Sequence, residues 1–114
     1  MSSRIPPIPE YKAMWLVAMF DLPVGTKLQR KAYTRFRKVL IHEGFLMLQF
    51  SVYARFCESE ESSEAHRNRV RQSLPGAGQV RLVALTDRQF GKMEVFLQGK
   101  LTDVEEEPEQ ILLF

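Results

Sequence analysis

The sequence has little of what a disulfide-linked or membrane-spanning protein needs. Only one of its 114 residues is a cysteine, Cys57, so no disulfide can form within the chain. No cluster of His and Cys has the spacing of zinc ligands. The longest apolar run, Met14–Phe20, is far too short to span a bilayer, and Asp21 follows it instead of a small-residue cleavage site. We therefore expect one domain in the cytoplasm, with no membrane anchor and no signal peptide.

Acidic residues are scarce outside the C-terminal end of the chain. The formal net charge of +2 conceals this, because residues 1–100 hold all 16 Lys and Arg but only nine acids, whereas residues 101–114 hold five acids and no base. A basic body attracts polyanions, of which nucleic acid is the commonest. The charge distribution therefore favours nucleic acid as a partner.

No acid at all occurs between Asp21 and Glu43, where the periodicity predicts a helix with Thr26 as its N-cap and Gly44 after its end. Apolar residues occupy one side of this helix, namely Leu28, Ala32, Phe36, Val39 and Leu40. Cations lie opposite and at the flanks, namely Lys27, Arg30, Lys31, Arg35, Arg37 and Lys38. Like charges at helical spacing destabilise by a few tenths of a kcal/mol per pair. We therefore predict that these six cations contact nucleic-acid phosphates; the alternative is a merely solvated face.

The order of the predicted elements indicates a ferredoxin-like α+β sandwich, βαββαβ, with an extra C-terminal strand. The elements are a strand at 14–20, the helix at 26–43, one long strand or two short ones at 45–56, a helix at about 58–74, and strands at 79–86 and 92–100. One antiparallel sheet would carry both helices on one face. Its other face would be solvated or covered by a second chain.

Three regions follow from this order. We expect a flexible, proline-rich N-terminal extension at 1–13, a ferredoxin-like domain at 14–98, and an acidic tail at 99–114. The tail ends in the apolar sequence "ILLF", which favours docking on its own dimer or on another protein.

Several sequence features occur together in residues 17–56. They are the pair Phe20-Asp21 followed by Leu22-Pro23, the basic helix "RKAYTRFRKVL", and the segment Gly44–Tyr53 with Gln49 and Ser51. In combination they resemble the small CRISPR-associated adaptation proteins of the Cas2 family, most closely the members found with type II systems. The resemblance extends from about residue 14 to residue 98.

The resemblance implies a ferredoxin-like homodimer in which the C-terminal strand packs on the partner's sheet. It also implies that residues 45–56 form a hairpin, which the residues alone leave open. Proteins of this family sit between two dimers of the CRISPR integrase, Cas1, and help to insert new spacers into the repeat array. Several are also described as metal-dependent nucleases acting on single-stranded RNA or duplex DNA. The implied function is an adaptation subunit that binds duplex DNA and bridges the integrase, either with endonuclease activity or as a scaffold alone.

Asp21 has two possible roles at the end of the first strand. It can hydrogen-bond local backbone amides, as an aspartate before a turn often does. It can also bind Mg²⁺ or Mn²⁺, although one carboxylate is a poor site for a cation that prefers six oxygens. A two-fold axis near the strand end would bring two copies of Asp21 together, and the metal could then activate water and offset phosphate charge. The resemblance places the metal-binding, catalytic aspartate at Asp21.

Four aromatic residues are weaker candidates for nucleic-acid contact, and they are Tyr33, Phe36, Phe50 and Tyr53. Each could stack on a base, but aromatic residues at these spacings usually belong to the core. Cys57 is expected to be a buried, inert thiol.

Two other functions are compatible with the sequence. One is a free-standing Mg²⁺-dependent ribonuclease of the toxin type. The other is a ferredoxin-like regulator that binds RNA or a small ligand. The chain lacks the aromatic signature of RNA-recognition domains on a central strand, which disfavours the regulator.

Overall fold

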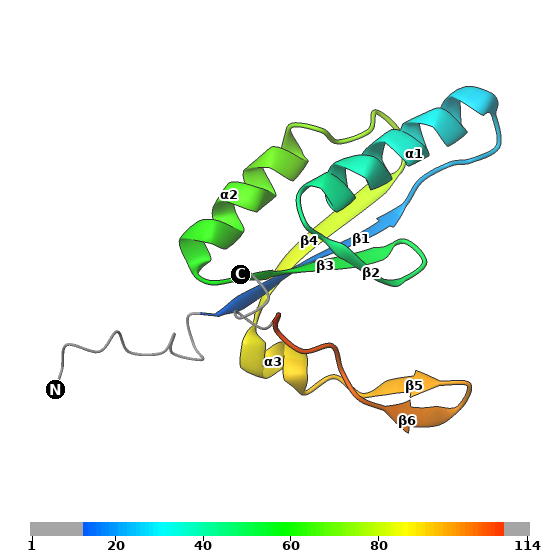
Figure 1. Ribbon diagram of the computed structural model, residues 1–114. Coiled ribbons are helices and arrows are strands. Elements are labelled where there is room, and N and C mark those ends of the chain that lie inside the picture. The colour runs from blue at the N-terminus through cyan, green and yellow to red at the C-terminus, as the bar shows by residue number, and fades with distance from the viewer. Residues whose placement is uncertain (1–12, 109–114) are drawn as a thin grey trace, which may run out of the picture.

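The computed structural model describes residues 13–108 (Figure 1). Its elements are β1 (Met14–Asp21), α1 (Lys27–His42), β2 (Leu46–Gln49), β3 (Val52–Cys57), α2 (Glu60–Arg71), β4 (Gln79–Thr86), α3 (Asp87–Gly91), β5 (Val95–Leu97) and β6 (Lys100–Thr102). The main sheet is antiparallel with the order β2-β3-β1-β4, and α1 and α2 lie on the same face of it. The predicted ferredoxin-like α+β fold is confirmed.

The helix-covered face of the sheet carries the larger apolar core. Leu16, Ala18 and Phe20 of β1 are buried there, because alternate side chains of a strand share one face. Phe36 from α1 and Val70 from α2 pack against them. Burying side chains of this size contributes about 1.5–3 kcal/mol each. This cluster therefore fixes both helices on the sheet.

Local signals set both ends of α1 as predicted. The Thr26 hydroxyl accepts a hydrogen bond from the Gln29 N–H at 3.1 Å, and the Gln29 side chain accepts one from the Thr26 N–H at 3.0 Å. After the helix, Gly44 has a φ of +88°, which is favourable only for glycine. Leu28, one of the apolar residues assigned to the same side of the helix as Phe36, is nevertheless 79% exposed. Leu28 lies in the first turn of α1, whereas the buried residues of the helix, Phe36 and Leu40, lie further along it.

The opposite face of the sheet is covered at one end by the chain that follows β4. Trp15 stacks on Phe90 of α3, with ring centroids 4.1 Å apart, and meets Phe56 edge-on at 5.5 Å. Its indole N–H donates to Asp87 Oδ1 at 2.7 Å. Val104 packs against the same cluster. The segment after β4 therefore packs against the main sheet and belongs to the same domain.

Residues 45–56 form a hairpin, which is what the family resemblance implied. Strands β2 and β3 are joined by a turn at Phe50 and Ser51, and Ser51 has a φ of +64°. The turn contains neither glycine nor proline, so sequence signals could not separate one strand from two.

The single strand predicted at 92–100 is wrong. The structure has two short strands, β5 and β6, paired in a sheet of their own that projects away from the main sheet (Figure 1). Gln98 and Gly99 between them both have positive φ, at 53° and 79°. This geometry is typical of a tight hairpin turn, where Asn-Gly or Asp-Gly is the usual sequence. Gln-Gly is a weaker signal, and it was missed.

Two predicted regions lie wholly or mostly outside the described residues. They are the N-terminal extension at 1–13, of which only residue 13 is described, and the apolar segment 111–114. Within residues 13–108 no helix is long and apolar enough to cross a bilayer.

Candidate nucleic-acid interface and candidate metal ligand

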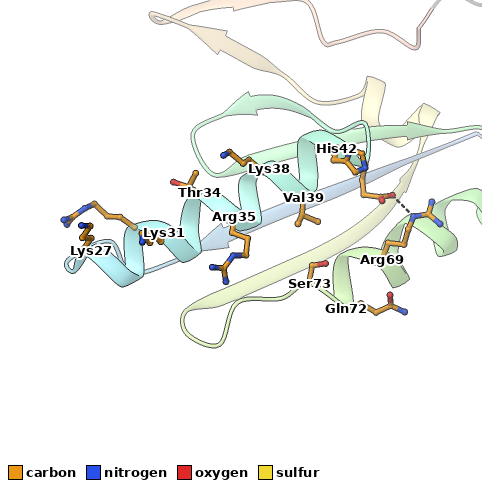
Figure 2. Close-up of a pocket in the computed structure, with 12 residues that line it drawn as sticks. Lys27, Lys31, Thr34, Arg35, Lys38, Val39, His42, Arg69, Gln72 and Ser73 are labelled. Carbon is orange, nitrogen blue, oxygen red and sulfur yellow. Dashed lines mark hydrogen bonds and ion pairs between the residues drawn. The ribbon is translucent and has the colours of Figure 1, made fainter.

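An open groove of about 950 Å³ runs between α1 and the C-terminal end of α2 (Figure 2). It is lined by Lys27, Arg30, Lys31, Thr34, Arg35, Lys38, Val39 and His42 of α1, by Glu43 after it, and by Arg69, Gln72 and Ser73 at the end of α2. Five of the six cations predicted to contact phosphates are among these residues.

The five α1 cations in the groove carry charges that the described protein does not neutralise. All five are exposed, and none forms an ion pair with any residue from 13 to 108. Arg30 donates only to the neutral backbone carbonyls of Val24 and Gly25, at 3.2 and 3.3 Å. These cations could therefore form ion pairs with an anionic ligand.

The sixth predicted cation, Arg37, lies elsewhere. Its Nε donates to the Tyr53 hydroxyl at 3.0 Å, and it does not line the groove. Tyr53 belongs to β3, so Arg37 points toward the β2–β3 hairpin rather than toward α2. The spacing of the six cations along α1 could not predict that five of them line the groove and that Arg37 bonds to the hairpin instead.

Arg69 is a groove residue that sequence reasoning missed as a candidate. The Glu43 carboxylate, 14% exposed, accepts a hydrogen bond from Arg69 Nε at 2.7 Å and lies 2.8 Å from His66 Nδ1. Burial raises the pKa of Glu43, but hydrogen bonds and charge from Arg69 and His66 outweigh burial and hold that pKa below its ordinary value of 4.5. Glu43 thus ties the end of α1 to α2 and holds Arg69 at the groove (Figure 2).

Asp21 does not line this groove. It is exposed at the end of β1, where it pairs with Gln79 of β4. Phe20 faces the helices, so the alternation along the strand turns Asp21 to the opposite face, which it shares with Trp15. A single chain therefore does not bring the predicted metal ligand and the predicted phosphate contacts into one site.

The backbone around Asp21 is held tightly, although its carboxylate is not. Gly78 has a φ of +84°, and a Cβ there would lie 2.6 Å from the Asp21 carbonyl oxygen. On the other side, the Phe20 N–H donates to the Ser51 carbonyl at 3.1 Å. The Asp21 carboxylate accepts no hydrogen bond from residues 13–108, so a role in bonding local amides is not seen.

One chain does not supply a complete metal site in its described part. Across residues 13–108, no group of three or more His, Cys, Asp or Glu side chains is arranged to hold a metal ion. Cys57 is buried, and burial raises the pKa of its thiol, as expected of an inert cysteine. Asp21 is a hard oxygen donor without a partner in this range, so it fits Mg²⁺ as one ligand of a shared site.

The fold and these surfaces define a small ferredoxin-like protein with a groove of unneutralised cations and an uncommitted strand-end carboxylate. The sequence profile of the family "CRISPR associated protein Cas2" matches residues 14–93. The chain belongs to the CRISPR-associated Cas2 family.

Individual relatives agree with this assignment. A CRISPR-associated endoribonuclease Cas2 of Parvibaculum lavamentivorans is 46% identical over 89% of this chain and 100% of the relative. One of Flavobacterium psychrophilum is 43% identical over 92% of this chain and 91% of the relative. A solved structure described as "Crystal structure of cas2" superposes with a TM-score of 0.54 over 85% of this chain and 99% of that one, at 14% identity. That likeness supports the fold.

Proposed function

We propose that this protein is a CRISPR adaptation subunit that binds duplex DNA through the α1–α2 groove and bridges the CRISPR integrase Cas1. The observation that carries the proposal is the set of five exposed α1 cations in one groove, none of them paired with an acid in residues 13–108. Cations of this kind contact phosphates and position a duplex without reading its sequence. Binding should therefore weaken as salt rises, with a slope of about −0.9 per phosphate neutralised.

We also propose Mg²⁺-dependent endonuclease activity that requires Asp21. The relatives from Parvibaculum and Flavobacterium are named endoribonucleases. Asp21 is exposed and its carboxylate is uncommitted, and two copies meeting at their uncovered sheet faces would supply two carboxylates. A bound Mg²⁺, or Mn²⁺ in its place, would supply charge neutralisation at the phosphate and activation of water. The role of Asp21 is to hold that cation at the end of β1.

A homodimer is part of the same proposal. The β5–β6 hairpin exposes Phe96, Leu97 and Leu101, although an isolated two-stranded hairpin is barely stable in water. Packing of these side chains on the sheet of a second copy would bury them. Sedimentation of the wild type as a dimer, and of Phe96→Ser as a monomer, would support this role.

The test of cleavage compares wild type, Asp21→Asn and the control Asp103→Asn on labelled single-stranded RNA and duplex DNA. Asp103 is another exposed aspartate, located after β6. We expect cleavage by wild type and by the control in Mg²⁺, and none in EDTA or with Asp21→Asn. Equal cleavage by Asp21→Asn would contradict the assignment of Asp21.

A free-standing ribonuclease is the second candidate, favoured by the names of the relatives. Co-purification separates the two functions. An adaptation subunit should be retained by the integrase, and this retention should not depend on Asp21. A protein that cleaves RNA in Mg²⁺ and is never retained by the integrase would support the ribonuclease instead.

A further inference from the structure

The tip of the β2–β3 hairpin presents an aromatic ring to solvent. Phe50 occupies the turn and is 78% exposed, so its expected place in the core is wrong, whereas Phe36 and Tyr53 are buried as expected. At 78% exposure, this large apolar side chain gains little from burial in its own chain. Its position instead suits contact with something outside the fold.

Tyr33 of α1 supports this ring from behind. The two ring centroids lie 5.9 Å apart with an interplanar angle of 21°, which is a stacked arrangement. The Tyr33 hydroxyl and Ser51 Oγ form a hydrogen bond at 3.2 Å, and Tyr33 contacts the buried Phe20 edge-on at 5.8 Å. The pair is therefore anchored to the core, and the exposure of Phe50 leaves ring surface open for a further stacking partner.

Arginines flank the aromatic pair along α1. Arg30 and Arg37 lie three residues before and four residues after Tyr33, and this spacing puts the three on one stripe of the helix. Arg37 is held by the Tyr53 hydroxyl at 3.0 Å, a neutral partner, and so keeps its full charge available. The position of Arg37 away from the groove thus places a cation beside an aromatic platform.

The platform also lies at the same end of the sheet as Asp21. In the β1–β3 pairing Met19 is opposite Val52, and the Phe20 N–H donates to the Ser51 carbonyl at 3.1 Å. The pairing of the two strands ends there, because Phe50 and Ser51 form the turn into β2. The aromatic pair lies on the helix-covered side of the sheet, whereas the alternation along β1 turns the Asp21 side chain to the other side.

We propose that Phe50, backed by Tyr33, stacks on an unpaired base of a single-stranded nucleic acid while Arg37 contacts the adjacent phosphate. This rests on the proposed function, because it concerns the nucleic acid that the protein binds. Stacking tolerates every base, since each has a π-face, but bases inside a duplex are already stacked on their neighbours. Phe50 therefore selects for single-stranded character rather than for sequence.

The test measures binding of single-stranded and duplex oligonucleotides to wild type, Phe50→Leu and Phe50→Trp. Leucine keeps the apolar bulk and removes the π-face, whereas tryptophan keeps a π-face. We expect Phe50→Leu to bind single strands about tenfold more weakly, with duplex affinity unchanged, and Phe50→Trp to retain wild-type affinity. A single-stranded probe containing 2-aminopurine should show quenched fluorescence with wild type and Phe50→Trp but not with Phe50→Leu. RNA and DNA versions of each strand show which backbone the site prefers.

Some results would overturn the proposal. Equal binding of single strands by wild type and Phe50→Leu would mean that Phe50 does not stack, even if duplex binding persists and the proposed function stands. A changed sedimentation coefficient in Phe50→Leu would assign the ring to contact with a second copy of the chain. A wild type that binds neither single strands nor duplex would contradict the proposed function as well.

Discussion

Helices α1 and α2 have the same role in the fold and different outer surfaces. Each lies on the same face of the sheet and is anchored by buried apolar residues, Phe36 in α1 and Val70 in α2. Two acids of α2, Glu60 and Glu61, lie in its first turn and two arginines, Arg69 and Arg71, lie in its last, as the helix dipole favours. Arg71 also donates a hydrogen bond to Glu64 at 3.4 Å. Helix α1 has no acid in its first turn, and its groove cations have no ion-pair partner in residues 13–108. The comparison shows that packing on the sheet does not require the charge pattern of α1, and this supports the proposal that α1 binds an anionic ligand.

The largest expected effect tests what the two helices share. We expect Phe36→Ala to lower the free energy of unfolding by about 3–5 kcal/mol, because it leaves a cavity in the core. Val70→Ala should cost about 2 kcal/mol, because the lost side chain is smaller. Urea denaturation followed by circular dichroism measures both. Leu28→Ala, at an exposed α1 position, is the control and should change stability by less than about 0.5 kcal/mol.

The next effect tests how the helices differ. Replacement of Lys27, Lys31 and Arg35 by glutamine should weaken duplex binding at least tenfold and make the salt slope shallower by about 0.9 per lost phosphate contact. The matched control replaces Arg71, Arg88 and Lys92, which are exposed and lie outside the groove. Both variants lose the same net charge. Equal loss of binding in the two would show that overall charge, and not the groove, attracts the nucleic acid.

The smallest effect concerns the contact that joins the two helices. Because Glu43 has a lowered pKa, its stabilising contribution is present above its ordinary pKa of 4.5 and is lost as the pH falls through the folded-state value. Glu43→Gln should therefore cost about 1 kcal/mol at pH 7 and less at pH 3. Unfolding measured across this range, with exposed Glu64→Gln as the control, tests the prediction. A pH-independent difference between wild type and Glu43→Gln would contradict it.

Local signals in the sequence were sufficient for most of the fold and for much of the candidate site. The ends of α1 follow from Thr26 and Gly44, whose side-chain hydrogen bond and positive φ act within a few residues. The bounds of β4 follow from its own apolar pattern, and the predicted strand at 79–86 has the bounds found in the structure. The residues alone did not predict the two hairpin turns, because neither Phe50-Ser51 nor Gln98-Gly99 has a strong turn signal; the family resemblance implied the first hairpin but not the second.

By itself the sequence determined the order of elements, the absence of acids on α1 and the place of Asp21 at the end of β1. These features depend on periodicity and on neighbours along the chain. Three features were decided only by the tertiary structure. Arg69 lines the groove, and Arg37 does not line it but donates a hydrogen bond to Tyr53 of the β2–β3 hairpin. Phe50 is exposed and stacks on Tyr33. The physical reason is that each of these depends on how segments distant in sequence pack against one another, and no local pattern records that packing.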